Sequence, residues 1–238
     1  MSREITADFD SLLDFLKKYS ITKHTEDHNF IKIISTEHKK YFAYLTCIAE
    51  LIHLSKTQSL TPELSDDQIL FLKESCSDIG NAYFVMIHGA YKPSRLMLRS
   101  SIETFLKGFT LDEYTGVTTE KSLYKIFETV KKLPFFESEL IKSMYDDIHS
   151  KYGKLSEDIH TATELNMTHV TALNYFPEFN KIEAEQISKY ISELVMNYIA
   201  LITIKYNAYF FKMHHKSREI ILANIERSVR PLIVGIEK

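Results

Sequence analysis

Residues 93–109 contain three charged side chains at regular intervals, and these are the first candidates for a binding or catalytic site. Arg95, Arg99 and Glu103 are four residues apart, so an α-helix, which turns about 100° per residue, carries them as one stripe. The large apolar residues of the segment fall beside this stripe: Leu98, Ile102, Phe105, Leu106 and Phe109. We therefore expect the arginines to border the core, where a guanidinium group needs an acid or a bound anion.

Two interpretations of the stripe remain open. In the first, Glu103 pairs with Arg99 one helical turn away and a neighbouring helix supplies an acid for Arg95, so that the stripe is structural. In the second, the stripe binds an anion, because one carboxylate cannot fully satisfy two guanidinium groups.

A second group of polar residues lies some fifty positions further along the chain. Tyr152, Ser156 and His160 are spaced at i, i+4 and i+8, and Leu155 and Ile159 form the adjacent apolar stripe. If the helix continues through the intervening glycine, a phenol, a hydroxyl and an imidazole share one edge of the core. This spacing yields no Ser-His-Asp triad, because the histidine lacks an orienting acid. The simpler alternative for the histidine is a hydrogen-bonded residue at the core boundary.

Together the two segments read R-S-x-x-E at residues 99–103 and Y-x-x-L-S-x-x-x-H at residues 152–160. This pair resembles the HEPN-like helical superfamily, and most closely its bacterial members in phage-defence, abortive-infection and toxin–antitoxin settings. The resemblance covers about residues 66–215. It implies an all-α up-and-down bundle, frequent homodimerisation and, often, metal-independent cleavage of RNA. In the catalytic branches a histidine follows an arginine after four to six residues, a spacing that this sequence does not contain.

The resemblance, with the helix geometry, suggests roles for these side chains in RNA cleavage. Such a reaction needs a base for the ribose 2′-OH and a cation for the charge that builds on the phosphate. His160 would be the base, Arg95 or Arg99 the cation, Glu103 an orienting acid, and Ser156 or Tyr152 a hydrogen-bond donor to the phosphate. The first predicted function is thus an endoribonuclease effector, expected as a homodimer with RNA as substrate and a regulatory protein partner, and with no cofactor or metal. The alternative is a non-catalytic helical binding or dimerisation module in which Arg95, Arg99 and Glu103 form an ion-pair cluster.

The elements that must position these residues are predicted to be helices. The 238 residues are 45% apolar and include 11 glycines and prolines, while leucine, isoleucine, lysine and glutamate recur every three or four positions. We predict a single helical domain, with N-terminal helices in 1–60, a core in 66–215 and a C-terminal helix and tail in 216–238. The expected helices cover 5–19, 27–57, 66–89, 93–109, 119–132, 137–162, 182–215 and 217–228. Asp66 and Thr118 or Thr119 are the expected N-caps, and Pro93 fits a first turn.

Composition and charge exclude several classes of protein. A net charge of −3 argues against a broad basic surface that coats duplex nucleic acid. Cys47 and Cys76 form no C-x-x-C motif, so no disulfide framework or cysteine zinc site is indicated. The acidic N-terminal segment lacks the features of a signal peptide. Residues 190–211 are the most apolar stretch, but the uncharged run 194–204 is too short to cross a bilayer. We therefore expect a buried core helix and a cytoplasmic protein with no membrane contact.

Three further features of the sequence each allow a structural and a functional interpretation. His24 and His28 have the spacing of a helical zinc pair but lack a third ligand, and the acids between them suit a helix start instead. The basic run around residues 212–218, with Arg227 and Arg230, fits either phosphate contacts or a solvated helix end. The aromatic cluster near the C-terminus is expected to pack in the core and a dimer, with base stacking as the alternative; it comprises Tyr198, Tyr206, Tyr209, Phe210 and Phe211.

Overall fold

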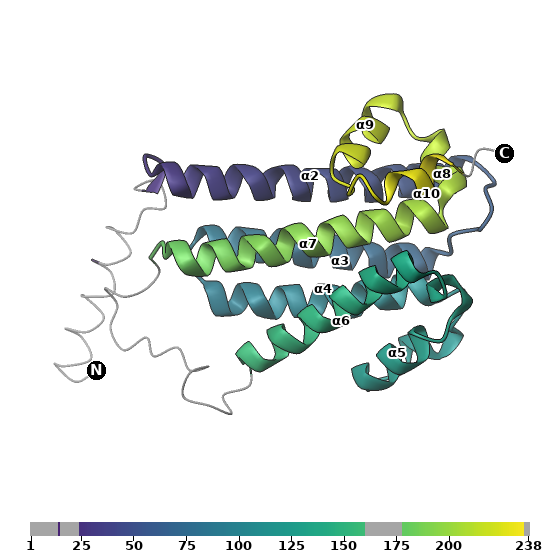
Figure 1. Cartoon of the computed structure of the whole chain (residues 1–238), viewed down its shortest axis with the longest axis horizontal. Helices are drawn as coiled ribbons and strands as arrows, with labels where there is room; N and C mark the ends of the chain where they lie inside the picture. The colour runs from purple at the N-terminus through teal and green to yellow at the C-terminus, as the bar shows by residue number, and fades with distance from the viewer. Residues whose placement is uncertain (1–13, 15–23, 160–177, 236–238) are drawn as a thin grey trace.

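The computed structural model describes residues 14, 24–159 and 178–235, and within these ranges it contains helices and no strands. The predicted all-α bundle is therefore confirmed. The long helices run roughly along one axis, and the short helices gather toward one end of the bundle (Figure 1). The long helices are α2 (His28–Thr57), α3 (Asp66–Ile87), α4 (Tyr91–Thr110), α6 (Glu139–Ile159) and α7 (Lys181–Lys205). The short ones are α5 (Leu123–Val130), α8 (Asn207–Lys212), α9 (His215–Ala223) and α10 (Arg230–Val234).

Side-chain caps fix where the helices begin. Asp27 caps α2 by accepting hydrogen bonds from the backbone N–H groups of Asn29 and Phe30. At the start of α3, Ser65 and Gln68 form a capping box, in which each side chain satisfies the other residue's backbone N–H. The expectation that Asp66 caps this helix is therefore wrong by one position.

Two glycines allow α3 and α4 to pair closely as an antiparallel hairpin. Gly89, in the turn between them, has φ +75°, a conformation that side chains disfavour. A Cβ on Gly89 would also lie 2.5 Å from the carbonyl oxygen of Glu178. Gly108 of α4 faces the backbone of α3, where a Cβ would lie 2.9 Å from the Leu72 nitrogen. The close fit of this hairpin sets the rotation of α4 and thus of its charged stripe.

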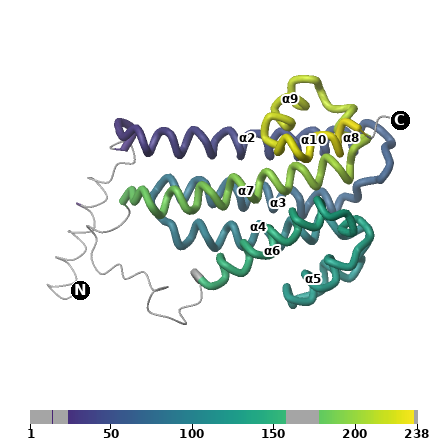
Figure 2. The backbone as a smooth tube through the Cα atoms, in the orientation of Figure 1, coloured from purple at the N-terminus to yellow at the C-terminus, as the bar shows by residue number. Residues whose placement is uncertain are grey.

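The C-terminal third differs from the sequence prediction. The helix expected over 182–215 ends at Lys205, and the chain continues through α8 and α9 instead of one straight helix. The helix expected over 217–228 corresponds to α9, which begins at His215 and already ends at Ala223, and α10 begins beyond the predicted range. Helices α8 and α9 pack over the second half of α2 (Figure 2). There the Ser217 hydroxyl donates to Glu50 (2.6 Å).

Smaller differences affect the middle of the chain. The helix expected over 119–132 is shorter, because residues 115–118 form a separate 3-10 turn and Ser122 caps α5. The predicted caps Thr118 and Thr119 are therefore wrong. The helix expected over 5–19 falls, apart from Asp14, outside the described residues.

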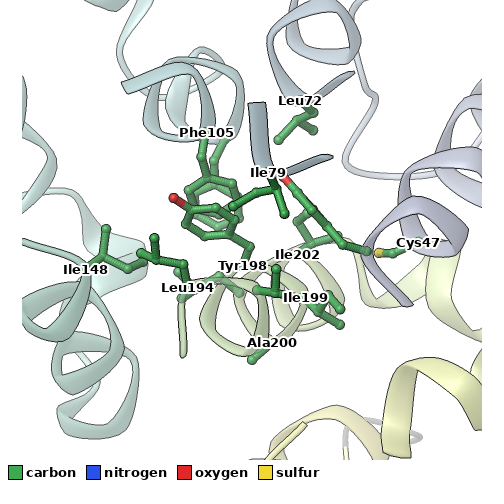
Figure 3. Close-up of a cluster of buried hydrophobic side chains, with 14 of the residues drawn as sticks. Cys47, Leu72, Ile79, Phe105, Ile148, Leu194, Tyr198, Ile199, Ala200 and Ile202 are labelled. Carbon is green, nitrogen blue, oxygen red and sulfur yellow. The ribbon is translucent and has the colours of Figure 1, made fainter. Parts of the chain in front are cut away.

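The core is built on α7, which the other long helices surround. Tyr198 of α7 stacks on Phe105 of α4, with ring centroids 3.9 Å apart and planes 12° apart (Figure 3). Ile79 of α3, Ile148 of α6 and Leu194 of α7 are all fully buried in the same cluster. Contacts with four other long helices explain why the most apolar stretch of the sequence lies here.

Buried hydroxyl groups lock four helices together inside this core. Tyr44 donates to Ser75 (3.1 Å), and Ser75 donates to the carbonyl oxygen of Ser101 (3.0 Å). The Ser101 hydroxyl donates to the Leu98 carbonyl (2.7 Å), so Tyr198 must donate to Ser101 (3.3 Å). This chain of bonds connects α2, α3, α4 and α7, and it holds the opposite side of α4 from its arginines.

Helix α7 is long and apolar enough to cross a membrane by composition, yet 61% of its most apolar window is buried within the bundle. The prediction of a buried core helix therefore agrees with the described residues. Both cysteines are buried and free.

Candidate functional site

Arg99 of α4 faces two hydroxyl groups of α6. Its Nη2 donates to the Tyr152 hydroxyl (2.6 Å) and its Nε donates to the Ser156 Oγ (3.2 Å). The guanidinium carbon also lies 4.9 Å from the centroid of the Tyr152 ring, which is cation–π distance. We call Arg99, Tyr152 and Ser156 the Arg99 site. Arg99 of the predicted charged stripe therefore contacts Tyr152 and Ser156 of the second predicted group.

The local fold of α6 explains this meeting. Ile148 and Leu155 are fully buried and hold α6 against the bundle, and Tyr152 and Ser156 lie beside them on the same side of the helix. The helix continues through Gly153, as expected. All three members of the Arg99 site are partly exposed, so an incoming molecule can reach them.

Among the residues that the structure describes, no acid balances the charge of the site. Among the described residues no carboxylate lies within salt-bridge distance of Arg99, so its contacts there are a phenol, an alcohol and an aromatic ring. Neutral acceptors leave the site with one net positive charge. A partly desolvated cation in such a setting favours an anionic ligand.

Arg95 has a different environment. Its Nη2 donates to Glu183 Oε2 (2.5 Å) and to Gln186 Oε1 (3.0 Å), both on α7. The Arg95 side chain is 10% exposed. The structural interpretation of the stripe, an ion pair to a neighbouring helix, thus holds for Arg95, which ties α4 to α7.

Glu103 pairs within its own helix. Lys107 Nζ lies 2.7 Å from Glu103 Oε1, one turn further along α4. The expected pair between Glu103 and Arg99 is therefore not formed. The stripe divides into two neutralised positions, Arg95 and Glu103, on either side of an arginine that faces hydroxyls.

His160 lies outside the described residues, which end at residue 159 on this side of the gap. Its predicted role as a base therefore stays a prediction. The described part of α6 ends one residue before it.

A histidine that the sequence motif does not include lies near the Arg99 site. His149 of α6 is exposed, and its ring stacks on Phe127 of α5 with centroids 4.2 Å apart and planes 22° apart. The Phe127 ring also contacts Tyr152, at 5.2 Å between centroids. The signal that would have revealed His149 is the helical wheel, since it shares the face of α6 that carries Tyr152 and Ser156.

A buried acid, also missed from the sequence, lies between α2 and α7. Glu37 is fully buried, and its Oε1 accepts hydrogen bonds from Ser188 (2.6 Å) and Ser192 (3.0 Å). Burial raises the pKa of Glu37 from 4.5 to about 7, while the two serines and Lys40 act to lower it. Such an acid binds a proton near neutral pH, yet nothing connects it to the surface features described above.

The structure offers little support for a metal site. His24 lies in a turn before α2, so it does not share a helix with His28, and its ring contacts Phe30 and Phe179. Within the described ranges no group of three or more histidine, cysteine, aspartate or glutamate side chains is arranged to hold an ion.

The C-terminal aromatic cluster belongs to the core. Tyr198, Tyr206, Tyr209 and Phe210 are almost completely buried, and Phe211 packs against them. Base stacking on these four rings is therefore excluded.

A pocket of about 150 Å³ opens between α6, α7 and residues 226–229. Its polar lining includes Asp147, which already accepts from Asn197 (2.7 Å) and pairs with Lys151. The Arg99 site is not part of its lining.

Comparison with known proteins gave no match to a protein-family model, to a curated protein or to a solved structure.

Proposed function

We propose that this protein is a HEPN-like helical effector that binds RNA at the Arg99 site and cleaves it without a metal ion. The observation that carries the proposal is the arginine held by Tyr152 and Ser156 with no acid among the described residues to neutralise it. The resemblance of the two sequence segments supplies the reaction class, and the Arg99 site supplies a position for the phosphate.

The hydrogen-bond directions at this site suit a phosphate group. Arg99 uses two of its five N–H bonds on the hydroxyl oxygens, so both hydroxyl groups act as acceptors and keep their own protons. Remaining N–H groups of Arg99 and the O–H groups of Tyr152 and Ser156 are thus donors for phosphate oxygens. Donors that are positioned before the ligand arrives stabilise the charge that builds on phosphorus during cleavage.

Cleavage also needs a proton acceptor for the ribose 2′-OH. His160, four residues after Ser156, is the candidate that the sequence predicts for this role. Arg95 and Glu103 have structural roles in the proposal, because each is already paired with another charged side chain.

A second candidate function is non-catalytic binding of an anionic partner at the same site. The neutralised Arg95 and Glu103 favour it, because within the described part of the stripe they leave Arg99 as the cation without an acid, rather than a charged catalytic cluster. The absence of the Arg–His spacing of catalytic HEPN branches points the same way.

The test compares the wild type with Arg99→Ala and with Lys189→Ala, in which one exposed positive charge of α7 is removed. Binding of a short fluorescein-labelled single-stranded RNA is followed by anisotropy in EDTA, and cleavage by gel electrophoresis. We expect the wild type to bind and cleave, Lys189→Ala to match it, and Arg99→Ala to lose about 10²- to 10³-fold in cleavage rate.

The outcomes separate the two functions. Binding without cleavage supports the non-catalytic module, and a wild type that neither binds nor cleaves RNA refutes the ribonuclease. Expression of wild type and Arg99→Ala in bacteria, with growth and total RNA integrity compared, checks the effector role in cells.

The proposed assembly is a homodimer in the cytoplasm, controlled by a regulatory protein partner. Buried, reduced Cys47 and Cys76 are compatible with a reducing compartment. Sedimentation velocity of the purified protein measures the oligomeric state directly.

A further inference from the structure

His149 is the described imidazole with a short chain of contacts to Arg99. Its ring stacks on Phe127, the Phe127 ring contacts Tyr152, and the Tyr152 hydroxyl accepts from Arg99. These contacts come from three helices, α5, α6 and α4, so the arrangement is fixed by tertiary packing rather than by the α6 sequence alone.

The face of α6 places His149 with the hydroxyls of the site. Relative to His149, Ser156 is rotated by about 20° and Tyr152 by about 60° on an ideal helix. His160 falls within about 20° on the same wheel. The face thus presents two imidazoles, and His149 is the one within the described part of the chain.

The imidazole of His149 is held by stacking and keeps its nitrogens available. Within the described ranges it makes no hydrogen bond and no ion pair, whereas the Phe127 ring supports its flat side. Phe127 is itself 1% exposed and forms part of the core, which makes it a rigid support.

Resting on the proposed function, we propose that His149 is the catalytic residue that accepts the proton of the RNA 2′-OH. The 2′-oxygen forms a bond to the adjacent phosphorus while the bond from phosphorus to the 5′-oxygen breaks. Arg99, Tyr152 and Ser156 hold the phosphate oxygens as their charge increases. The leaving 5′-oxygen takes a proton from water, and the imidazolium gives its proton to the resulting hydroxide. The products are a 2′,3′-cyclic phosphate and a 5′-hydroxyl end.

Charged groups on the surrounding elements leave this role open to His149. Glu128 of α5 and Asp146 of α6 act on the neighbouring Tyr145, and Arg99 of α4 lies beyond Tyr152.

The experiment measures RNA affinity and cleavage separately for His149→Ala, His149→Gln and His160→Ala. The matched control is His38→Ala, because His38 of α2 is also exposed and stacked on an aromatic ring, that of Phe42 (6.2 Å, 17°). All assays contain EDTA and the same fluorescein-labelled single-stranded RNA. Thermal unfolding of each variant shows that the fold is retained.

We expect both His149 variants to bind RNA within about twofold of wild type while cleavage falls by about 10²- to 10⁴-fold. Added imidazole should restore part of the cleavage to His149→Ala, since the lost side chain leaves a solvent-accessible gap on the stacked face of Phe127. Imidazole should not restore cleavage to Arg99→Ala. His38→Ala should behave as the wild type.

Two results would overturn the assignment in distinguishable ways. If wild type cleaves, Arg99→Ala is impaired and His149→Ala cleaves at the wild-type rate, the role of His149 is wrong and the proposed function stands; loss of cleavage in His160→Ala alone would then assign the base to His160. If the wild type neither binds nor cleaves RNA, the proposed function fails and the role of His149 fails with it.

Discussion

Replacing Glu37 with glutamine should make the stability of the protein less sensitive to pH between about 4.5 and 7. Glu37 is fully buried between α2 and α7, with Ser188 and Ser192 as hydrogen-bond donors to one oxygen. Lys40 of α2 and Tyr83 of α3 are the nearby titratable groups with which it interacts. Because burial penalises the charged form, the folded protein holds the Glu37 proton more tightly than the unfolded chain does.

The sign and size of this pH dependence follow from the difference between the pKa of Glu37 in the folded protein and its pKa in the unfolded chain. Below pH 4.5 the carboxyl is protonated in both states, so its burial carries no ionisation penalty. Between 4.5 and about 7 the unfolded chain releases the proton first, and the free energy of unfolding falls as the pH rises. Since one pKa unit corresponds to about 1.4 kcal/mol, a rise from 4.5 to about 7 corresponds to a loss of about 3 kcal/mol at higher pH.

Urea denaturation at several pH values between 4 and 8.5 measures this effect. The free energy of unfolding of Glu37→Gln minus that of the wild type should increase by about 3 kcal/mol from the acid to the alkaline end. Other ionisable groups are common to both proteins and cancel in the difference. Glu185→Gln, which changes a half-exposed glutamate of α7, is the control and should give a flat difference. A flat difference for Glu37→Gln as well would refute the burial argument.

Two further predictions concern packing and capping, and both are measured by urea denaturation. Gly108→Ala should destabilise the protein by about 1–3 kcal/mol, because its Cβ would meet the α3 backbone at 2.9 Å. Gly153→Ala, with open space at the same atom, should instead stabilise by about 0.5–1 kcal/mol, so equal effects would contradict the close-packing account. Ser65→Ala should cost about 1 kcal/mol through loss of the α3 cap, whereas Asp66→Ala should cost about 0.3 kcal/mol through the helix dipole. A larger loss of stability for Asp66→Ala than for Ser65→Ala would show that Ser65 is not the cap.

The helices α2, α3 and α4 were predictable because their boundaries are marked by local sequence, with the caps Asp27 and Ser65 before α2 and α3 and Gly89 in the turn between α3 and α4. Each end of these three helices lies within two residues of its predicted position. The break after Lys205 has no such mark. It coincides with Tyr206, which is fully buried and accepts a hydrogen bond from Gln68 (2.9 Å), a residue 138 positions away. Lys205 itself pairs with Asp112 and Glu113. Long-range contacts of this kind override a helical pattern that continues without interruption.

The sequence predicted which helix faces carry the residues of the candidate site, but it did not predict which side chains pair with one another. The helical wheel correctly predicted that the arginines of α4 border the core and that Tyr152 lies beside the apolar stripe of α6. It did not reveal that Arg95 pairs with Glu183, 88 residues away, or that Lys107 takes Glu103. His149 was missed because the sequence motif begins at Tyr152, although the same face of α6 extends one turn further back.

The different partners of Arg95 and Arg99 carry the functional argument. Both arginines border the same core, and both lose part of their hydration there, so both need compensation. Arg95 receives it from a carboxylate, which makes it a sound structural link between α4 and α7. Among the described residues, Arg99 donates hydrogen bonds to two hydroxyl oxygens and lies over an aromatic ring. Neutral groups compensate the lost hydration of a cation less than a carboxylate does. An anion at this position would therefore gain more from Arg99 than it would from an arginine that is already paired with a carboxylate.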